Sequence, residues 1–225
     1  MDEKTIIDGL IYYIGLIVLL TLHEFGHAWT AWRCGDDTAK LQGRVSLNPL
    51  VHIDLVGTVI LPLLLIFVSP SWGRFLVGWA KPVPVNPYNL GNPRRDDLLV
   101  TLAGPAMNLA LALVLMLLAR VGLLIHSGDL VVLSLQWAVL SLRLCFFNLI
   151  PIPPLDGSQV MRNLTHMSYE TYNQISRFGF IGVILVLQVP FVRAMIFQST
   201  FGTLSLMARV AGVPHEVLSG LFGIA

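Results

Sequence analysis

The sequence has little charge for its length. Of its 225 residues, 12% are Asp, Glu, Lys or Arg, 55% are hydrophobic, and the mean hydropathy is +0.75. A soluble domain carries about twice that share of charge, so a soluble protein is excluded and a polytopic membrane protein is predicted. The formal net charge is only +1. Without a long basic run, nucleic-acid binding has no support.

Cysteine is scarce as well. Cys34 and Cys145 lack the spacing of metal ligands, and nothing in the sequence suggests a disulfide framework. Cys145 lies in an apolar run and is expected to be a small core residue. The first apolar run has no basic segment before it beyond Lys4, so we expect it to be retained and not cleaved as a secretion signal.

Long apolar runs are abundant. A helix needs about 20 apolar residues to cross a bilayer core, and four runs meet this length: Ile6–Ala31, Leu98–Ile125, Leu130–Ile150 and Ile175–Phe197. The predicted fold class is therefore an all-α polytopic membrane protein with about four to five transmembrane helices.

Three other segments are not predicted to be ordinary spans. Leu55–Val68 is short and contains Pro62, which suits a re-entrant or shallow element, although a crossing stays open. Ser69–Asp97 is rich in Pro, Gly and aromatic residues, and its proline alternation predicts an extended edge segment. Such a segment could pair with an unwound stretch of substrate as an added strand. Ser199–Ala225 is expected to be an interfacial helix.

The most informative feature is His23-Glu24-Phe25-Gly26-His27, which lies inside the first apolar run. Two histidines four residues apart lie on one face of a helix, as zinc ligation by imidazole requires. Glu24 can then accept a proton from water that the metal activates. Ionisable side chains are costly at membrane depth, so this motif predicts a metal site over the alternative of a chance match.

A catalytic zinc usually has three protein ligands and one open position. The best candidate for the third ligand is Asp156, because it ends a run from Asn148 in which three prolines forbid a regular helix. Irregular backbone at such a depth is tolerated only where protein or a wet cavity covers it. The alternative is an ordinary helix exit, with Asp156-Gly157 as a surface turn.

Taken together, these motifs resemble the site-2 protease family of intramembrane metalloproteases. The resemblance rests on H-E-F-G-H, Gly104-Pro105-Ala106-Met107-Asn108 and N-x-x-P-x-P-x-L-D-G, and extends to Leu47-Asn48-Pro49, His52-Ile53-Asp54 and Pro82–Val85. It covers nearly the whole chain and fits the compact form without PDZ or CBS domains. We therefore expect one intramembrane metalloprotease domain over 1–225, with core spans of about 6–31, 98–125 and 130–157 and a peripheral span of about 175–197.

The resemblance implies a zinc-dependent endopeptidase that hydrolyses peptide bonds in or near transmembrane segments of membrane proteins. One Zn²⁺ per chain would be bound by His23, His27 and Asp156, with Glu24 as the general base. Asn148 is expected near the substrate carbonyl, although a helix-end cap or an interhelical hydrogen bond is an alternative role. The implied partners are a transmembrane protein substrate and the lipid bilayer.

The ligand positions also predict an orientation in the membrane. To share one metal, Asp156 and the two histidines must lie near the same membrane face, so residues 32–97 begin and end on that side. Nine Lys and Arg residues fall on that side (Arg33, Lys40, Arg44, Arg74, Lys81, Arg94, Arg95, Arg162, Arg177), against four on the other (Lys4, Arg120, Arg193, Arg209). Since these residues prefer the cytoplasmic side, we expect a multi-pass protein of the cytoplasmic membrane with its active site toward the cytosol.

The residues also bear on two other functions and on a possible role for His52 and Asp54. A membrane-anchored zincin with a glutamate third ligand is disfavoured, because no glutamate lies in a second helical metal motif. A non-catalytic zinc-binding scaffold or carrier stays open, and Glu24 distinguishes it, since a carrier needs no base. His52 and Asp54 could orient a metal ligand, but a loop at the membrane interface would hold them equally well.

Overall fold

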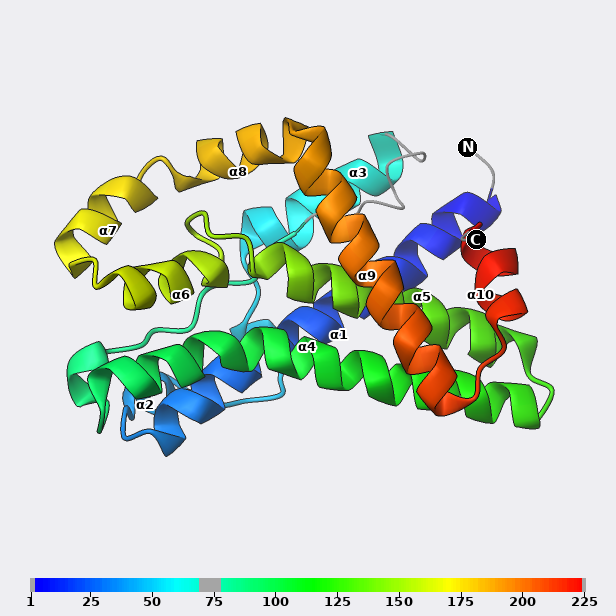
Figure 1. The fold of residues 1–225 in the computed structure, drawn as a ribbon, viewed down its shortest axis with the longest axis horizontal. Helices are drawn as coiled ribbons and strands as arrows, with labels where there is room; N and C mark the ends of the chain where they lie inside the picture. The colour runs from blue at the N-terminus through cyan, green and yellow to red at the C-terminus, as the bar shows by residue number, and fades with distance from the viewer. Residues whose placement is uncertain (1–2, 69–77, 224–225) are drawn as a thin grey trace. The chain divides into compact units, whose positions relative to one another are not determined.

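The structure is a computed structural model that describes residues 3–68 and 78–223. All regular elements in these residues are helices (Figure 1), and three are long and apolar enough to span a membrane: Ile6–Arg33, Pro93–Leu124 and Gly128–Asn148. A fourth span is possible if two helices joined by a bend count as one. The predicted all-α polytopic membrane fold is confirmed. The chain forms two compact units, Met1–Gly104 and Pro105–Ala225.

The first unit is built on α1 (Glu3–Arg33), which carries the first predicted span. Its buried apolar positions include Leu16, Leu20 and Ala31, which lie on one face of a helix with a period of 3.6 residues. The helix ends at Arg33, and Gly35 turns the chain with a φ of +103°, a left-handed conformation that favours glycine. The short helix α2 (Thr38–Leu41) follows and packs against α1.

Short helices occupy the region that was predicted to be re-entrant or shallow. They are η1 (Pro49–Val51), the π-helix η2 (Leu55–Ile60) and α3 (Leu61–Val68). Pro62 lies at the junction of η2 and α3, where its missing N–H interrupts the regular hydrogen-bond pattern. The apolar helical stretch Leu55–Phe67 is shorter than the ~20 residues of a full crossing. Its contact with α1 buries Ile66.

Residues 78–86 are neither helix nor strand, and the η4 turn (Pro87–Asn89) follows them. The predicted extended segment begins earlier, and its residues 69–77 lie outside the described residues. Two backbone bonds attach the described part to the preceding helices: Trp79 N–H donates to the Gly57 carbonyl at 3.2 Å, and Lys81 N–H to the His52 carbonyl at 2.8 Å. The described part of the predicted extended segment contains no strand, and these bonds attach it to the protein itself.

The second unit contains most of α4 (Pro93–Leu124), together with α5 (Gly128–Asn148) and α9 (Pro190–Ala211). Helix α9 packs along α5, and α10 (His215–Phe222) packs against α9. The core of this unit consists of buried apolar residues from all four helices and from the turn between α9 and α10: Ala112, Met116, Ala119, Val131, Leu135, Ala138, Val139, Leu142, Phe201, Leu204, Ala208, Val213 and Leu218.

The structure differs from the sequence prediction at the peripheral span, which was expected over 175–197. This region holds the end of α7 (Tyr169–Ser176), all of α8 (Gly179–Gln188) and the start of α9, and α8 and α9 meet at an angle of 83° (Figure 1). Pro190 causes the break, because it donates no N–H and restricts Val189 to an extended conformation. Helix α9 then continues to Ala211. The predicted interfacial helix, Ser199–Ala225, therefore consists of the second half of α9 and the separate helix α10.

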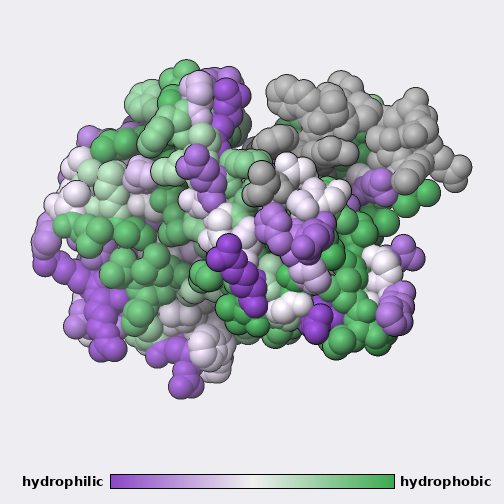
Figure 2. Space-filling model, turned by 45° about the vertical axis from the view of Figure 1, so that its right-hand side comes forward, coloured by the Kyte–Doolittle hydropathy of each residue, from purple (hydrophilic) through white to green (hydrophobic). Residues whose placement is uncertain are grey.

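Figure 2 shows several hydrophobic patches, with hydrophilic residues between them. On α4 the exposed apolar side chains include Leu113, Val114, Leu117, Leu118 and Val121. Apolar surface of this extent is unusual on a soluble monomer and is expected where helices face lipid.

We predict that Leu204→Ala lowers the free energy of unfolding by about 2–5 kcal/mol, because it opens a cavity in the core of the second unit. Leu204 is fully buried, whereas Leu206 on the same helix is 62% exposed. The matched control Leu206→Ala should change the free energy by less than about 0.5 kcal/mol. Denaturant titration of the purified protein in detergent measures both, and equal effects would contradict the packing described.

Candidate metal centre

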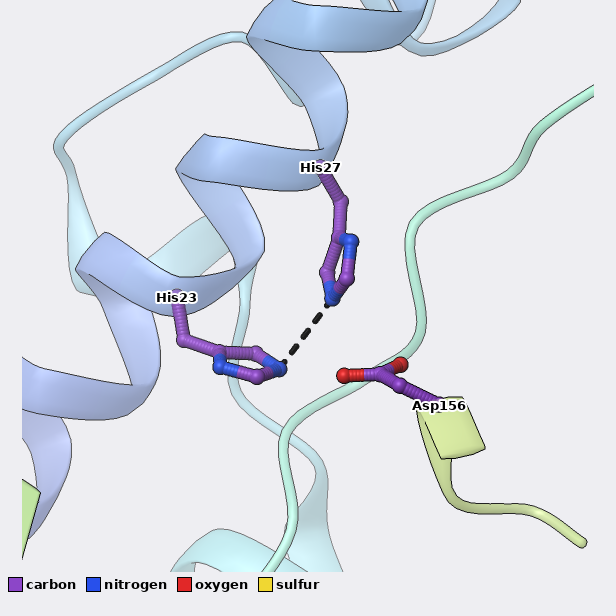
Figure 3. Close-up of side chains that lie close together, drawn as sticks. All are labelled: His23, His27 and Asp156. Atoms are coloured by element: carbon purple, nitrogen blue, oxygen red, sulfur yellow. Dashed lines mark hydrogen bonds between the residues drawn. The ribbon is translucent and has the colours of Figure 1, made fainter. Parts of the chain in front are cut away.

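Helix α1 places the side chains of His23 and His27 one turn apart on one face, as the spacing predicts. The two Nε2 atoms are 3.1 Å apart, and the ring centroids are 4.7 Å apart with the ring planes nearly perpendicular (Figure 3). Both side chains are buried, with exposed fractions of 3% and 8%. Two imidazole nitrogens thus point at the same small volume.

The spacing of the two nitrogens fits a tetrahedral zinc ion. With Zn–N bonds of about 2.0–2.1 Å, two ligand nitrogens lie about 3.3 Å apart, close to the 3.1 Å between His23 and His27. His27 Nδ1 lies 2.7 Å from the carbonyl oxygen of Val100. Because a carbonyl only accepts, Nδ1 must carry the proton, which leaves the lone pair of Nε2 for a metal.

Gly104 lies directly against the imidazole pair. A Cβ atom built on Gly104 would lie 2.6 Å from His23 Nε2 and closer still to His27 Nε2. Val100 and Gly104 are four residues apart on α4, so one helical face supplies both the carbonyl that orients His27 and the space for both rings. The sequence places Gly104 in a helix-packing motif, and the structure adds this specific neighbour.

The carboxylate of Glu24 is held by the extended segment. The backbone N–H of Val83 donates to Glu24 Oε2 at 3.1 Å, so Val83 N–H points at the protein and is not a donor for an added substrate strand. Glu24 follows His23 in the helix and is partly exposed. The predicted base therefore has a fixed orientation and access from outside the core.

Asp36 anchors the other end of the extended segment. It is fully buried after α1, and its carboxylate accepts from the N–H of Asn86 at 2.6 Å and from Asn89 Nδ2 at 3.0 Å. Burial raises the pKa of Asp36, but hydrogen bonds from Thr38, Asn86 and Asn89 outweigh it and hold the pKa below its ordinary value. The carboxylate therefore stays ionised at neutral pH and keeps the segment attached.

Asp156, the predicted third ligand, is the first residue of α6 (Asp156–Thr165) in the second unit. Helix α5 ends at Asn148, earlier than the predicted 157, and the prolines keep residues 149–155 irregular. A Cβ atom on Gly157 would lie 2.6 Å from the carbonyl oxygen of Ile150, so glycine allows α6 to begin against this backbone. Asp156 and Gly157 thus begin a helix and do not form a turn, with Gly157 buried and Asp156 partly exposed.

Among the described residues, His23, His27 and Asp156 form a group that could hold a metal ion, with one ligand atom from each (Figure 3). Two imidazole nitrogens and one carboxylate oxygen are a donor set that zinc accepts, and three protein ligands leave a position for water or substrate. The residues present therefore fit a catalytic zinc.

The other residues singled out in the sequence have local partners. Asn148 Nδ2 donates to the Leu144 carbonyl at 2.9 Å, which is the helix-end bond considered as its alternative role. Asp54 caps η2 by accepting from the N–H groups of Val56 and Gly57. His52 Nε2 lies 2.8 Å from the carbonyl oxygen of Ser46. The catalytic role of Asn148 stays a prediction.

Comparisons with known proteins agree with this donor set. The model of peptidase family M50 matches residues 11–125 and 122–188. The protein YwhC of Bacillus subtilis (strain 168), named as a zinc metalloprotease, is 39% identical over 79% of this chain and 80% of its own length. Rip2 of Mycobacterium tuberculosis (strain H37Rv), also named so, is 32% identical over 90% of this chain and 74% of its own length. No solved structure matches the chain.

We predict that Gly104→Ala abolishes tight metal binding, because the added methyl group displaces both imidazoles. The matched control is Gly202→Ala in α9, where an added Cβ meets nothing within 4 Å. Zinc content of the purified proteins, measured by elemental analysis, should fall at least about fivefold in Gly104→Ala and stay at the wild-type level in Gly202→Ala. Wild-type zinc content in Gly104→Ala would contradict the geometry.

Proposed function

This chain belongs to peptidase family M50 and is a zinc metalloprotease, and on that premise we propose that it cuts peptide bonds within or beside transmembrane segments of other membrane proteins. The zinc, one per chain, would be bound by His23, His27 and Asp156. Glu24 would serve as the general base. The partners would be a transmembrane protein substrate and the lipid bilayer, and the process a regulated intramembrane proteolysis.

One observation carries the proposal: the metal-binding pair lies inside a helix that is long and apolar enough to cross the bilayer. From His27 to the end of α1 at Arg33 is six residues, or about 9 Å at 1.5 Å per residue. Placing a carboxylate and two imidazoles at this depth costs free energy, and such residues usually mark a functional site. A peptide bond brought to this site is therefore one that lies in or near the hydrocarbon layer.

The residues around Glu24 are suited to moving a proton. Bound zinc would supply Lewis-acid activation of water and of the scissile carbonyl. Glu24 Oε2 is held by Val83 N–H, which leaves Oε1 to take the proton from the attacking water and return it to the leaving amine. Asn148 uses one amide N–H on Leu144, so a second N–H could donate to the substrate carbonyl.

Aromatic and cationic residues support an interface near the histidine end of α1. Arg33 lies over the ring of Trp29 at 5.9 Å, and Lys40 lies over the ring of Trp32 at 4.4 Å. Tryptophan is enriched where a helix leaves the hydrocarbon layer, and cations prefer the cytoplasmic side. These contacts, with the excess of Lys and Arg on the same side, support a site toward the cytosol.

We predict that Glu24→Gln retains bound zinc but lowers kcat at least about 100-fold, because it removes the base and keeps the ligands. His23→Ala and Asp156→Ala should each lose both zinc and activity. The measurements are zinc stoichiometry and cleavage of a helical transmembrane peptide reconstituted with the enzyme in lipid vesicles.

Two results would overturn the proposal. A wild-type protein that binds zinc but cuts no membrane-inserted peptide in a Glu24-dependent way would favour a scaffold or carrier. Full zinc content in Asp156→Ala would show that the third ligand is another residue.

We predict that Cys34, which follows α1, is labelled by a membrane-impermeant maleimide only from the cytosolic side. Cys34 is partly exposed and Cys145 is buried, so Cys145→Ser leaves one reactive thiol. A cysteine introduced at the exposed His126, between α4 and α5, should be labelled only from the outer side in a Cys34→Ser, Cys145→Ser background. The opposite pattern in intact cells and inverted vesicles would reverse the proposed orientation.

A further inference from the structure

Arg44 is a buried cation that has no part in the proposed zinc site. It follows α2 and is only 5% exposed. Its guanidinium donates to two successive carbonyls of the extended segment, to Lys81 through Nη2 at 2.5 Å and to Pro82 through Nη1 at 3.2 Å. A planar guanidinium presents several N–H groups in a fixed fork, so one side chain can fix two neighbouring carbonyls.

The bond to Pro82 has a direct consequence for Glu24. The carbonyl of Pro82 and the N–H of Val83 belong to one peptide group, which is planar and trans. Arg44 holds the oxygen end of this group, and Glu24 Oε2 accepts from its N–H end at 3.1 Å. A rotation that releases the oxygen from Arg44 must also turn the N–H away from Glu24. The peptide group therefore links the cation to the carboxylate.

His52 supports the guanidinium from the other side. Its Nε2 lies 2.8 Å from the Ser46 carbonyl oxygen, which only accepts, so the proton is on Nε2 and Nδ1 keeps a lone pair. Nδ1 lies 3.4 Å from Arg44 Nη2 and can accept from it. The backbone carbonyl of His52 also accepts from Lys81 N–H. His52 thus orients Arg44 and the segment that Arg44 holds.

The charges agree with this arrangement. Burial lowers the pKa of Arg44, and the Glu24 carboxylate acts in the opposite direction. Arginine keeps its proton in proteins, so a permanent positive charge lies buried near the predicted base. A low local dielectric strengthens both hydrogen bonds of the intervening peptide group, because the cation polarises its oxygen and the anion its N–H.

We propose that Arg44 is a positioning residue that orients the Glu24 carboxylate through the Pro82–Val83 peptide group, with His52 holding the guanidinium in place. This rests on the proposed role of Glu24 as general base. Among the described residues Arg44 makes no hydrogen bond to His23 or His27. The loss of Arg44 should therefore disturb the orientation of Glu24 and leave zinc binding unchanged. The loss should lower the rate of proton transfer and leave substrate affinity nearly unchanged.

The first experiment compares Arg44→Gln with the exposed Arg95→Gln, a loss of the same charge in the same unit. In lipid vesicles with the transmembrane peptide, Arg44→Gln should lower kcat about tenfold or more, with KM changed less than about threefold and zinc content unchanged. Arg95→Gln should match wild type. Loss of zinc in proportion to activity would show that Arg44 merely supports the fold, and would overturn the proposal.

The second experiment removes the N–H between the two charged groups. Val83→Pro deletes the donor to Glu24, and Val83→Ala keeps it. Val83→Pro should lower kcat about as much as Arg44→Gln, and the double variant should lose no more than either single variant, because both act through one peptide group. Multiplied losses in the double variant would show that Arg44 acts by another route.

Hydrogen exchange provides a readout that does not require activity. Because residues 82 and 84 are prolines, the segment 81–85 has three backbone N–H groups, those of Lys81, Val83 and Val85. In zinc-free protein, Arg44→Gln should speed the exchange of Val83 N–H, read by NMR or from overlapping peptides, about tenfold or more and leave α1 unchanged. Unaltered exchange would overturn the proposal. If wild type shows no Glu24-dependent cleavage, the proposed function fails; if wild type and Arg44→Gln cleave equally, only the role of Arg44 fails.

Discussion

The hydrogen bond between His27 and the carbonyl of Val100 is the interaction on which the site depends. It fixes the tautomer of His27, so that Nε2 faces His23 at the separation of two zinc ligands. The same face of α4 has no side chain at Gly104, which leaves space for both rings. A polar group in an apolar helix must be satisfied from within the protein. Here a backbone carbonyl does so and also prepares the ligand.

Backbone groups also define the surroundings of Glu24. The extended segment contributes the N–H of Val83, and side chains at both of its ends keep it in place: Arg44 on the carbonyls of Lys81 and Pro82, and Asp36 on the N–H of Asn86. An unpaired extended segment would otherwise move freely relative to α1. The orientation of the Glu24 carboxylate therefore depends on residues that are distant from it in the sequence.

Hydropathy and spacing were sufficient for the parts of the fold that depend on side-chain type. The runs that form α1, α4 and α5 are apolar over more than 20 residues. In the H-E-F-G-H motif, the spacing of four residues alone places both histidines on one face, because a helix repeats every 3.6 residues. The predicted span over 175–197 is bent by 83° where α8 meets α9, and Pro190, which is visible in the sequence, accounts for this bend.

The parts that could not be predicted depend on backbone groups and on neighbours. Any residue at position 100 would supply a carbonyl, so nothing in the sequence marks Val100 as the partner of His27. Gly157 could have belonged to a surface turn, and only its close approach to Ile150 shows why a larger residue would not fit. Arg44 resembles other loop cations until its two carbonyl partners are known. Long-range contacts of this kind leave no local pattern.

The proline inside α4 has a mechanical consequence. Pro105 follows Gly104 directly and cannot donate to the carbonyl of Thr101, four residues earlier, so this helix has one backbone bond fewer at that turn. Glycine and proline side by side also make it the turn of α4 with the weakest local support. The stretch of α4 that lies against both imidazoles is thus the stretch of this helix that resists bending least.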